Sequence, residues 1–62
     1  MDYSKLIKRI RETLLLSQEE LARKLGISFA TINRWENGHN IPTMKARRKI
    51  RDFCGRHKIE YF

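Results

Sequence analysis

The chain has 62 residues, enough for one small domain, because a chain this short removes only about 60% of its unfolded surface from water on folding. Its composition, 40% hydrophobic and 34% charged, is typical of a soluble folded chain and not of a disordered or fibrous one. Lys and Arg number 14 against 7 Asp and Glu, and the resulting net charge of +7 favours a polyanionic partner, either nucleic acid or an anionic membrane. A buried catalytic cleft with a cofactor is not expected at this size.

Cysteine content and hydropathy indicate an intracellular protein. Cys54 is the single cysteine, so no intrachain disulfide can form and a reducing compartment is expected. The longest apolar run, residues 14–16, is far shorter than the roughly 20 residues of a membrane helix. The N-terminus also lacks the apolar core of a signal peptide. We therefore expect a cytoplasmic protein with no membrane span.

Two helices are predicted in the first half of the chain. Apolar residues recur every three or four positions from Tyr3 onward, which predicts a helix over residues 3–13 or 3–14. Ser17 and Glu20 have the spacing of a capping box, so a second helix is predicted to begin at residue 18. Gly26 is suited to the positive φ that follows a helix end, which limits this helix to about two turns.

A third helix is predicted over about Phe29–Glu36, after a cap at Ser28. Asn, Gly and Pro then cluster in residues 37–42 and predict a loop, and Thr43 can cap a last helix. The apolar positions of this last helix are Met44, Ile50, Phe53 and Cys54. Its end is open between Gly55 and His57; the longer helix is preferred because it keeps one apolar face, with Lys58 turning the chain so that Ile59 folds back onto the core.

Positive charge is concentrated toward the C-terminus. Residues 1–16 hold four bases and two acids, residues 17–38 hold three of each, and residues 39–62 hold seven bases and two acids. The central helix pair is therefore neutral, and the flanks supply the attraction to a polyanion. A basic last helix that is simply solvated is the plainer alternative.

Two short helices joined only by residues 26–28 predict a helix-turn-helix, in which the second helix is presented outward. The chain reads IKRIRE at residues 7–12, QEELARKLGIS at residues 18–28 and TINRWENG at residues 31–38. On these motifs it resembles the Cro and phage-repressor (XRE-like) helix-turn-helix family of bacterial and phage transcription regulators. The resemblance covers nearly the whole chain. It implies an all-α, compact lambda-repressor-like DNA-binding domain of four helices, or five, spanning residues 1–62 with the motif at about 18–37.

In that family the second helix of the motif lies in the major groove of DNA. The resemblance therefore implies that the base-reading residues are Phe29, Ala30, Asn33 and Arg34. Arg34 is the most informative, because a guanidinium fork matches O6 and N7 of guanine, a contact worth about 1–3 kcal/mol of discrimination. Phe29 and Ala30 offer no hydrogen bonds and are suited to a thymine methyl group or to groove shape.

The resemblance also implies contacts to the DNA backbone. Gln18, at the positive N-terminus of the second helix, would bind a phosphate with its side chain and backbone N–H. The other phosphate candidates are Ser28, Thr31, Asn37, Asn40, Lys45 and Arg48. Arg11 and Glu36 are implied to form an internal ion pair, and an inward Glu36 is preferred because a carboxylate facing DNA would repel phosphates.

The chain departs from the family pattern in three places. Leu-Leu at residues 14–15 replaces the usual basic residue and Gly, which predicts a different turn or an exposed leucine. Arg47 stands where an apolar residue is common. The tail, residues 58–62, replaces a fifth helix that often builds the dimer contact, so the choice between monomer and homodimer stays open.

Other residues have simpler interpretations than a functional site. Trp35 shares the Ile32 stripe, so core packing is preferred over base stacking. Cys54 and His57 are half of a metal motif without a second pair, and a core thiol beside a surface imidazole is preferred over zinc. His39 is expected in solvent. No grouping suggests catalysis, so no enzyme activity, metal or cofactor is expected.

We predict sequence-specific binding of double-stranded DNA and regulation of transcription in a prokaryote or phage. Two alternative functions stay open. The first is an antitoxin or the DNA-targeting subunit of a larger assembly. The second is a protein-interaction module whose basic last helix docks an acidic partner.

Overall fold

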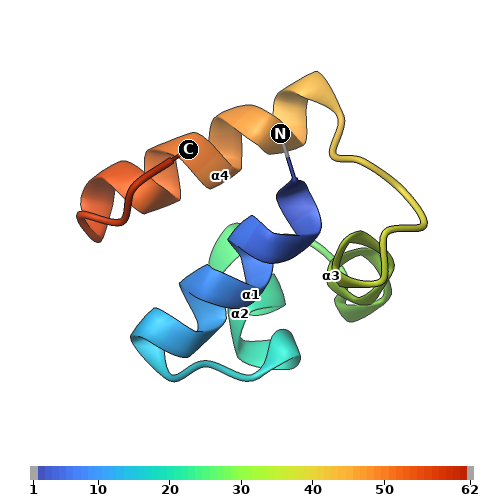
Figure 1. Cartoon of the computed structure of the whole chain (residues 1–62), viewed down its shortest axis with the longest axis horizontal. Helices are drawn as coiled ribbons and strands as arrows, with labels where there is room; N and C mark the ends of the chain where they lie inside the picture. Colours follow the sequence, from blue (N-terminus) through green and yellow to red (C-terminus); the bar gives the residue numbers. More distant parts are fainter. Residues whose placement is uncertain (1, 62) are drawn as a thin grey trace.

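Four α-helices follow one another along the chain, and the computed structural model describes residues 2–61. The helices are α1 (Tyr3–Leu14), α2 (Gln18–Leu25), α3 (Phe29–Glu36) and α4 (Met44–Arg56), as Figure 1 shows. No strand occurs between residues 2 and 61, so the all-α prediction is confirmed.

Local signals explain where the first three helices begin and end. The Ser17 hydroxyl accepts from the Glu20 N–H at 3.1 Å, and the Glu20 carboxylate accepts from the Ser17 N–H at 2.9 Å, which completes the predicted capping box. Gly26 follows α2 with φ of 70°, a conformation that glycine adopts at little steric cost. The predicted bounds of these three helices are confirmed.

The end of α1 is unusual because a leucine takes the left-handed conformation. Leu15 has φ of 57° and ψ of 46°, and the residue is 89% exposed. The Leu16 N–H reaches back to the Arg11 carbonyl at 2.8 Å and closes the helix end. The departure from the family pattern at residues 14–15 thus produces an exposed leucine in a position that favours glycine.

The last helix ends at Arg56, one residue before the predicted His57, which caps it instead. Lys58 then takes φ of 54° and turns the chain. The Ile59 N–H donates to the Cys54 carbonyl at 2.8 Å, and Ile59 packs partly buried against the core, as predicted.

Met44 fits the apolar period of α4 but lies outside the core. It is the first residue of α4 and is 61% exposed, because the helix start extends past the core. One turn later Arg47 is partly buried, with its guanidinium carbon 5.5 Å from the centre of the Tyr3 ring. At this edge of the core an arginine stem covers apolar surface.

The core draws on all four helices. Its buried apolar residues are Tyr3, Leu6, Ile7, Ile10, Leu21, Ala22, Leu25, Ile32, Trp35, Ile50, Phe53 and Cys54. Helix α3 packs against α1 and α2, and α2 also contacts α4. Trp35 is 5% exposed and Cys54 is fully buried, so both lie in the core as predicted.

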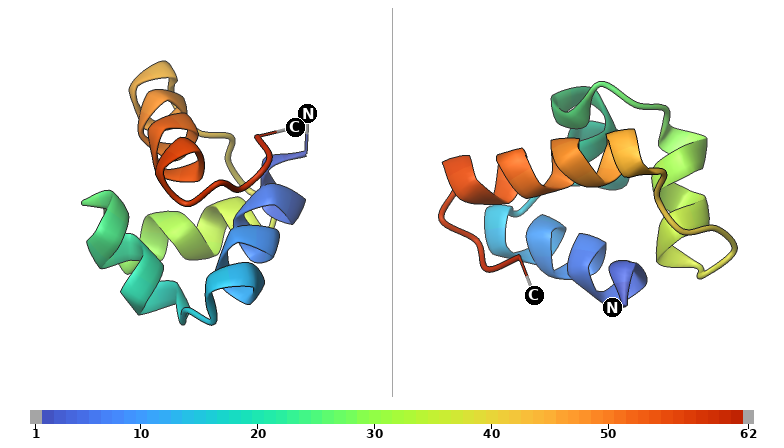
Figure 2. Two further views of the ribbon diagram at one scale, coloured as in Figure 1. Left: turned by 90° about the vertical axis from the view of Figure 1, so that its left-hand side faces the viewer. Right: turned by 90° about the horizontal axis from the view of Figure 1, so that it is seen from above.

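The tail after α4 returns to the start of the chain. Figure 2 shows it running beside α1, so that the two chain ends lie on the same side of the molecule. The Tyr61 and Tyr3 hydroxyls are hydrogen-bonded at 2.7 Å, and the Arg9 guanidinium donates to the Glu60 carbonyl. No fifth helix occurs up to residue 61; Phe62, the end of the predicted tail, lies outside the described residues.

Candidate nucleic-acid interface

Helices α2 and α3 form a helix-turn-helix around the turn at residues 26–28. The Ser28 hydroxyl accepts from the Thr31 N–H at 3.1 Å and begins α3 immediately after the turn. The buried side of α3 consists of Ile32, Trp35 and Glu36. Since these three residues hold one side of the helix against α1 and α2, the opposite side is presented to solvent.

The four predicted base-reading residues share the outward side of α3. Ala30 and Arg34 are exposed, Phe29 is 47% exposed, and Asn33 is half-buried. Phe29 with Asn33, and Ala30 with Arg34, have the four-residue spacing that aligns side chains along a helix. The Asn33 side-chain Oδ1 accepts from the Asn37 side-chain Nδ2 at 2.9 Å. The structure therefore brings these residues together on one surface.

The predicted phosphate-binding residues lie in three places around α3. Gln18 is half-buried at the first position of α2. Ser28 and Thr31 share a hydrogen bond between their hydroxyls, of 2.8 Å, at the start of α3. The remaining four are exposed at the end of α3, in the following loop and on the first turns of α4: Asn37, Asn40, Lys45 and Arg48.

Arg11 of α1 and Glu36 of α3 form the ion pair that the resemblance implies. The Arg11 Nε and Nη2 atoms donate to the two Glu36 carboxylate oxygens at 2.6 and 2.8 Å. Burial of Glu36 opposes its charged form, but hydrogen bonds from Arg11 and Gln18 outweigh it and hold the pKa of Glu36 below its ordinary value. Glu36 is therefore a buried carboxylate that faces the protein interior, not the outer face of α3.

Two features of the site were not predicted from the sequence. Gln18, a phosphate candidate, lies near enough to Glu36 to help lower the pKa of that carboxyl. The Arg47 Nε–H donates to the Pro42 carbonyl at 3.1 Å, across the start of α4. The only sequence signal for the second contact was a basic residue on an otherwise apolar stripe.

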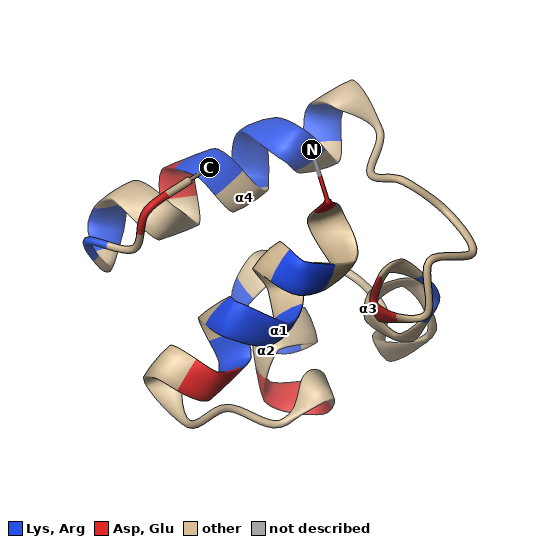
Figure 3. Cartoon of the chain, in the orientation of Figure 1, with Lys and Arg blue, Asp and Glu red and all other residues tan. Residues whose placement is uncertain are grey.

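Cationic side chains gather on α4. Lys45, Arg48, Lys49 and Arg51 are exposed there, and Figure 3 shows the basic segments over the first half of the helix. Helix α3 contains one base, Arg34, and one acid, Glu36. Since Glu36 is buried, the outer face of α3 carries positive charge only at Arg34.

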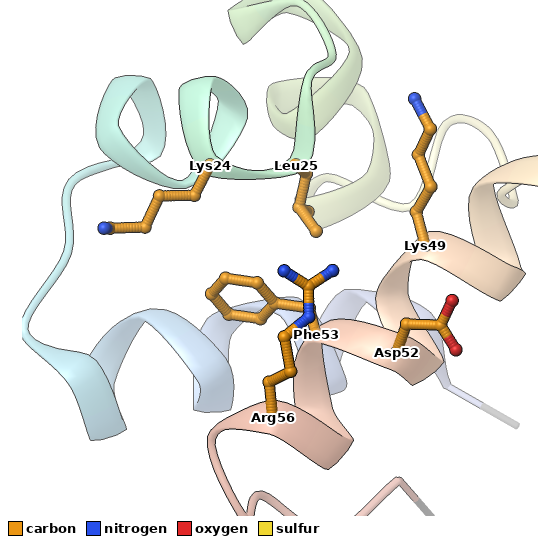
Figure 4. Close-up of a pocket in the computed structure, with 6 residues that line it drawn as sticks. All are labelled: Lys24, Leu25, Lys49, Asp52, Phe53 and Arg56. Carbon is orange, nitrogen blue, oxygen red and sulfur yellow. The ribbon is translucent and has the colours of Figure 1, made fainter.

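A pocket between the end of α2 and α4 has a volume of about 200 Å³. Its lining is mostly charged, and Figure 4 shows these side chains around it: Lys24, Leu25, Lys49, Asp52, Phe53 and Arg56. Small-molecule sites are mostly apolar and are typically about 300–1,000 Å³. This hollow is therefore part of the charged surface and lacks the character of a substrate pocket.

Between residues 2 and 61, no three or more His, Cys, Asp or Glu side chains gather in a way that could hold a metal ion. None of the four helices described is both long and apolar enough to cross a bilayer.

Comparison with known families agrees with this geometry. A family model described as helix-turn-helix matches residues 7–60, which includes most of α1 and all of α2, α3 and α4. The chain belongs to the helix-turn-helix family. It is the XRE-like family that the motifs resemble, and the fold is its lambda-repressor-like domain.

Two relatives in this family are transcriptional regulators by name. The HTH-type transcriptional activator BcrR of Enterococcus faecalis is 32% identical over 53 residues, 86% of this chain and 26% of that protein. An uncharacterized transcriptional regulator in the ATPase CF(0) region of Rhodospirillum rubrum is 44% identical over 34 residues, 55% of this chain and 32% of that protein. The chain thus spans about a quarter to a third of each relative's length. No solved structure matches it significantly.

Proposed function

We propose that this helix-turn-helix chain regulates transcription by sequence-specific binding of double-stranded DNA, with α3 in the major groove. The observation that carries the proposal is the outward face of α3, where Phe29, Ala30, Asn33 and Arg34 lie together. A major groove about 12 Å wide admits one α-helix. Membership of the family and the names of both relatives support the same function.

The four residues on this face would have different roles in reading bases. Arg34 is exposed and ends in a fork of N–H donors, which suits the two acceptors of guanine. Asn33 keeps its amide N–H₂ available to a base while its carbonyl oxygen is held by Asn37. Phe29 and Ala30 would contact a thymine methyl group or the groove wall.

The phosphate candidates would hold the duplex on both sides of α3. Gln18 stands at the N-terminus of α2, where backbone N–H groups and the helix dipole favour an anion. Asn40, Lys45 and Arg48 would hold the backbone beside the other end of the recognition helix, together with Asn37. Ser28 and Thr31 would contribute hydroxyls at the start of α3. These contacts position the protein and carry no sequence preference of their own.

The cellular role proposed here is occupation of promoter DNA in the cytoplasm of a bacterium or of a phage-infected cell. We further propose a homodimer on the operator, in which two-fold pairing of helix-turn-helix units would place the half-sites about 10 base pairs apart. A palindromic consensus would support the dimer, and a single short site would indicate a monomer.

Selection of duplexes from a random pool, followed by affinity measurements against salt, tests the proposed function. We expect the selection to enrich one sequence. The logarithm of the binding constant should fall against the logarithm of the salt concentration with a slope of about −4 to −5, for roughly 4–6 phosphate contacts. Gln18→Ala should weaken binding to every sequence by a similar factor. A pool that stays random together with a flat salt response would reject DNA as the ligand.

A further inference from the structure

A continuous series of contacts joins the C-terminal tail to the loop after α3. The Tyr61 hydroxyl is 2.7 Å from the Tyr3 hydroxyl, and the two rings lie 6.5 Å apart at an angle of 59°. The Arg47 guanidinium lies over the Tyr3 ring, with its carbon 5.5 Å from the ring centre. Its Nε–H donates to the Pro42 carbonyl at 3.1 Å. Residues from the start of α1, the loop before α4, α4 itself and the tail thus form one connected set.

The loop at the end of this series carries part of the proposed DNA contact. Asn40 lies two residues before Pro42, and α4 with Lys45 begins two residues after it. Pro42 has a fully buried side chain, whereas Ile41 beside it is 70% exposed. The loop is therefore anchored at Pro42, and Arg47 is the side chain that holds the carbonyl of that anchor.

The two contacts of Arg47 require a guanidinium group at this position. A planar guanidinium can stack over an aromatic ring and at the same time donate a hydrogen bond in its own plane. Tyr3 is only 6% exposed, so the arginine stem also covers apolar surface. An apolar side chain at residue 47 could fill this place but could not hold the Pro42 carbonyl.

We propose that Arg47 is a positioning residue for DNA binding, and that the tail, through Tyr61 and Tyr3, sets how firmly Arg47 holds the loop that precedes α4. Arg47 is assigned no contact with DNA. This inference rests on the proposed function, because its consequence is expressed in the affinity for a duplex. Changes in the tail, away from the outer face of α3, would alter affinity through these contacts.

The first test compares two variants that lose the same charge from the same helix. Arg47→Met keeps the stem over Tyr3 and removes the donor to Pro42, and Arg51→Met removes an exposed guanidinium one turn later. Both reduce electrostatic attraction. We expect Arg47→Met to bind the selected duplex about three- to tenfold more weakly than Arg51→Met, in the range by which contact networks alter affinity. Equal affinities of the two variants would overturn the assignment.

The second test removes one hydroxyl and no charge. Tyr61→Phe should weaken duplex binding about threefold at a temperature where circular dichroism shows every variant fully folded. In the double variant Arg47→Met with Tyr61→Phe the two losses should not add, because the tail acts through Arg47. A purely structural role would lower the melting temperature and leave the affinity of the folded protein unchanged. That outcome, or strict additivity, would refute the coupling.

A third measurement needs no DNA and separates this inference from the proposed function. In Tyr61→Phe and in Arg47→Met we expect lower backbone order parameters at residues 39–41 and 43, and unchanged values within α2. If the order parameters at residues 39–41 and 43 do not change, the link between tail and loop is wrong even where the wild type binds DNA. If the loop loosens but the wild type binds no duplex, the proposed function and the role assigned to Arg47 in it both fail.

Discussion

Arg11 and Glu36 connect the first helix to the last turn of α3 through two hydrogen bonds, of 2.6 and 2.8 Å. The Glu36 side chain is 3% exposed and that of Arg11 is 25% exposed. Because the pair is taken largely out of water, each charge depends on the other for solvation. The orientation of α3, and with it the direction in which Arg34 points, therefore depends on an ion pair that is remote from the outer face of α3.

Removal of one partner of this pair should strongly destabilise the protein. Arg11→Met should lower the free energy of unfolding by about 3 kcal/mol, because Glu36 keeps a buried and unpaired charge. Arg11→Met combined with Glu36→Leu should recover part of this loss, since no buried charge remains. Urea unfolding followed by the fluorescence of Trp35, the single tryptophan, measures both changes.

The matched control is Arg51→Met, which removes an exposed arginine 3.6 Å from the Asp52 carboxylate. Exposed ion pairs contribute about 0–1 kcal/mol to stability, so this change should hardly alter the midpoint of urea unfolding. Similar losses for Arg11→Met and Arg51→Met would show that the Arg11 pair has no special role.

The stability of the fold should decrease in acid. The pKa of Glu36 is lowered in the folded protein from its ordinary value of 4.5, since hydrogen bonds from Arg11 and Gln18 outweigh the effect of burial. The unfolded chain therefore takes up a proton at Glu36 at higher pH than the folded chain does. The stabilisation from this carboxylate is complete above about pH 4.5 and is lost as the pH falls through the lower, folded pKa.

Hydrogen bonds at two helix starts also lower the pKa of a carboxyl group in the folded protein. The Ser4 hydroxyl lowers the pKa of Asp2, and the Ser17 backbone N–H lowers that of Glu20. Unfolding curves between pH 7 and pH 3 test the expectation. Glu36→Gln should be less stable at pH 7 and should lose less stability on acidification than the wild type; a parallel pH dependence in both proteins would contradict it.

Leu15 offers an opportunity to stabilise the protein. A non-glycine residue in the left-handed region costs roughly 1–2 kcal/mol, and the exposed Leu15 side chain offsets little of this by packing. The greater conformational entropy that glycine loses on folding offsets part of this gain. Leu15→Gly should therefore raise the free energy of unfolding by about 0.5–1 kcal/mol.

Gly26→Ala is the opposite experiment at the end of α2. Gly26 has φ of 70°, and an added Cβ would meet only the Lys49 Nζ at 3.8 Å, an ordinary contact. The loss expected, about 1 kcal/mol, therefore comes from the backbone conformation and not from a clash. Thermal melts of the two variants should shift in opposite directions; a lower melting temperature for Leu15→Gly would show that this leucine is important for packing.

Cys54 should be protected from thiol reagents in the folded protein. Its side chain is fully buried, and burial raises the pKa of the thiol although the charge of Arg9 opposes the shift. Reaction must wait for an opening of the fold. If that opening costs about 3 kcal/mol, labelling should be about a hundredfold slower than in urea. Equal labelling rates with and without urea would show that α4 does not cover this residue stably.

The helices could be predicted because their signals are local. The capping box of Ser17 and Glu20, the glycine after α2 and the three- to four-residue apolar spacing lie within the segments that they define. Met44 is exposed although it fits the apolar period of α4, because periodicity gives a side of the helix but not how far the core extends along it. The end of α4 depended on the turn at Lys58, which left the helix one residue shorter.

The site was predictable only in part. The apolar stripe indicated which side of α3 is buried, and the positions of its outer residues then followed from the family resemblance. The contact of Tyr61 with Tyr3 joins residues 58 positions apart, and the Arg47 contact with Pro42 depends on how α4 is seated. No local pattern contains such relationships, because they arise when the helices pack.

Binding of the wild type and of Arg34→Ala to the selected duplex, and to every single base-pair substitution of it, tests the central claim most directly. Arg34 is exposed on the outer face of α3, and a guanidinium contact with guanine contributes about 1–3 kcal/mol of discrimination. We predict that the wild type discriminates at a G·C pair by that amount, and that Arg34→Ala loses discrimination at this one position while keeping it elsewhere. An Arg34→Ala profile that equals the wild-type profile at every position would contradict the placement of α3 in the major groove.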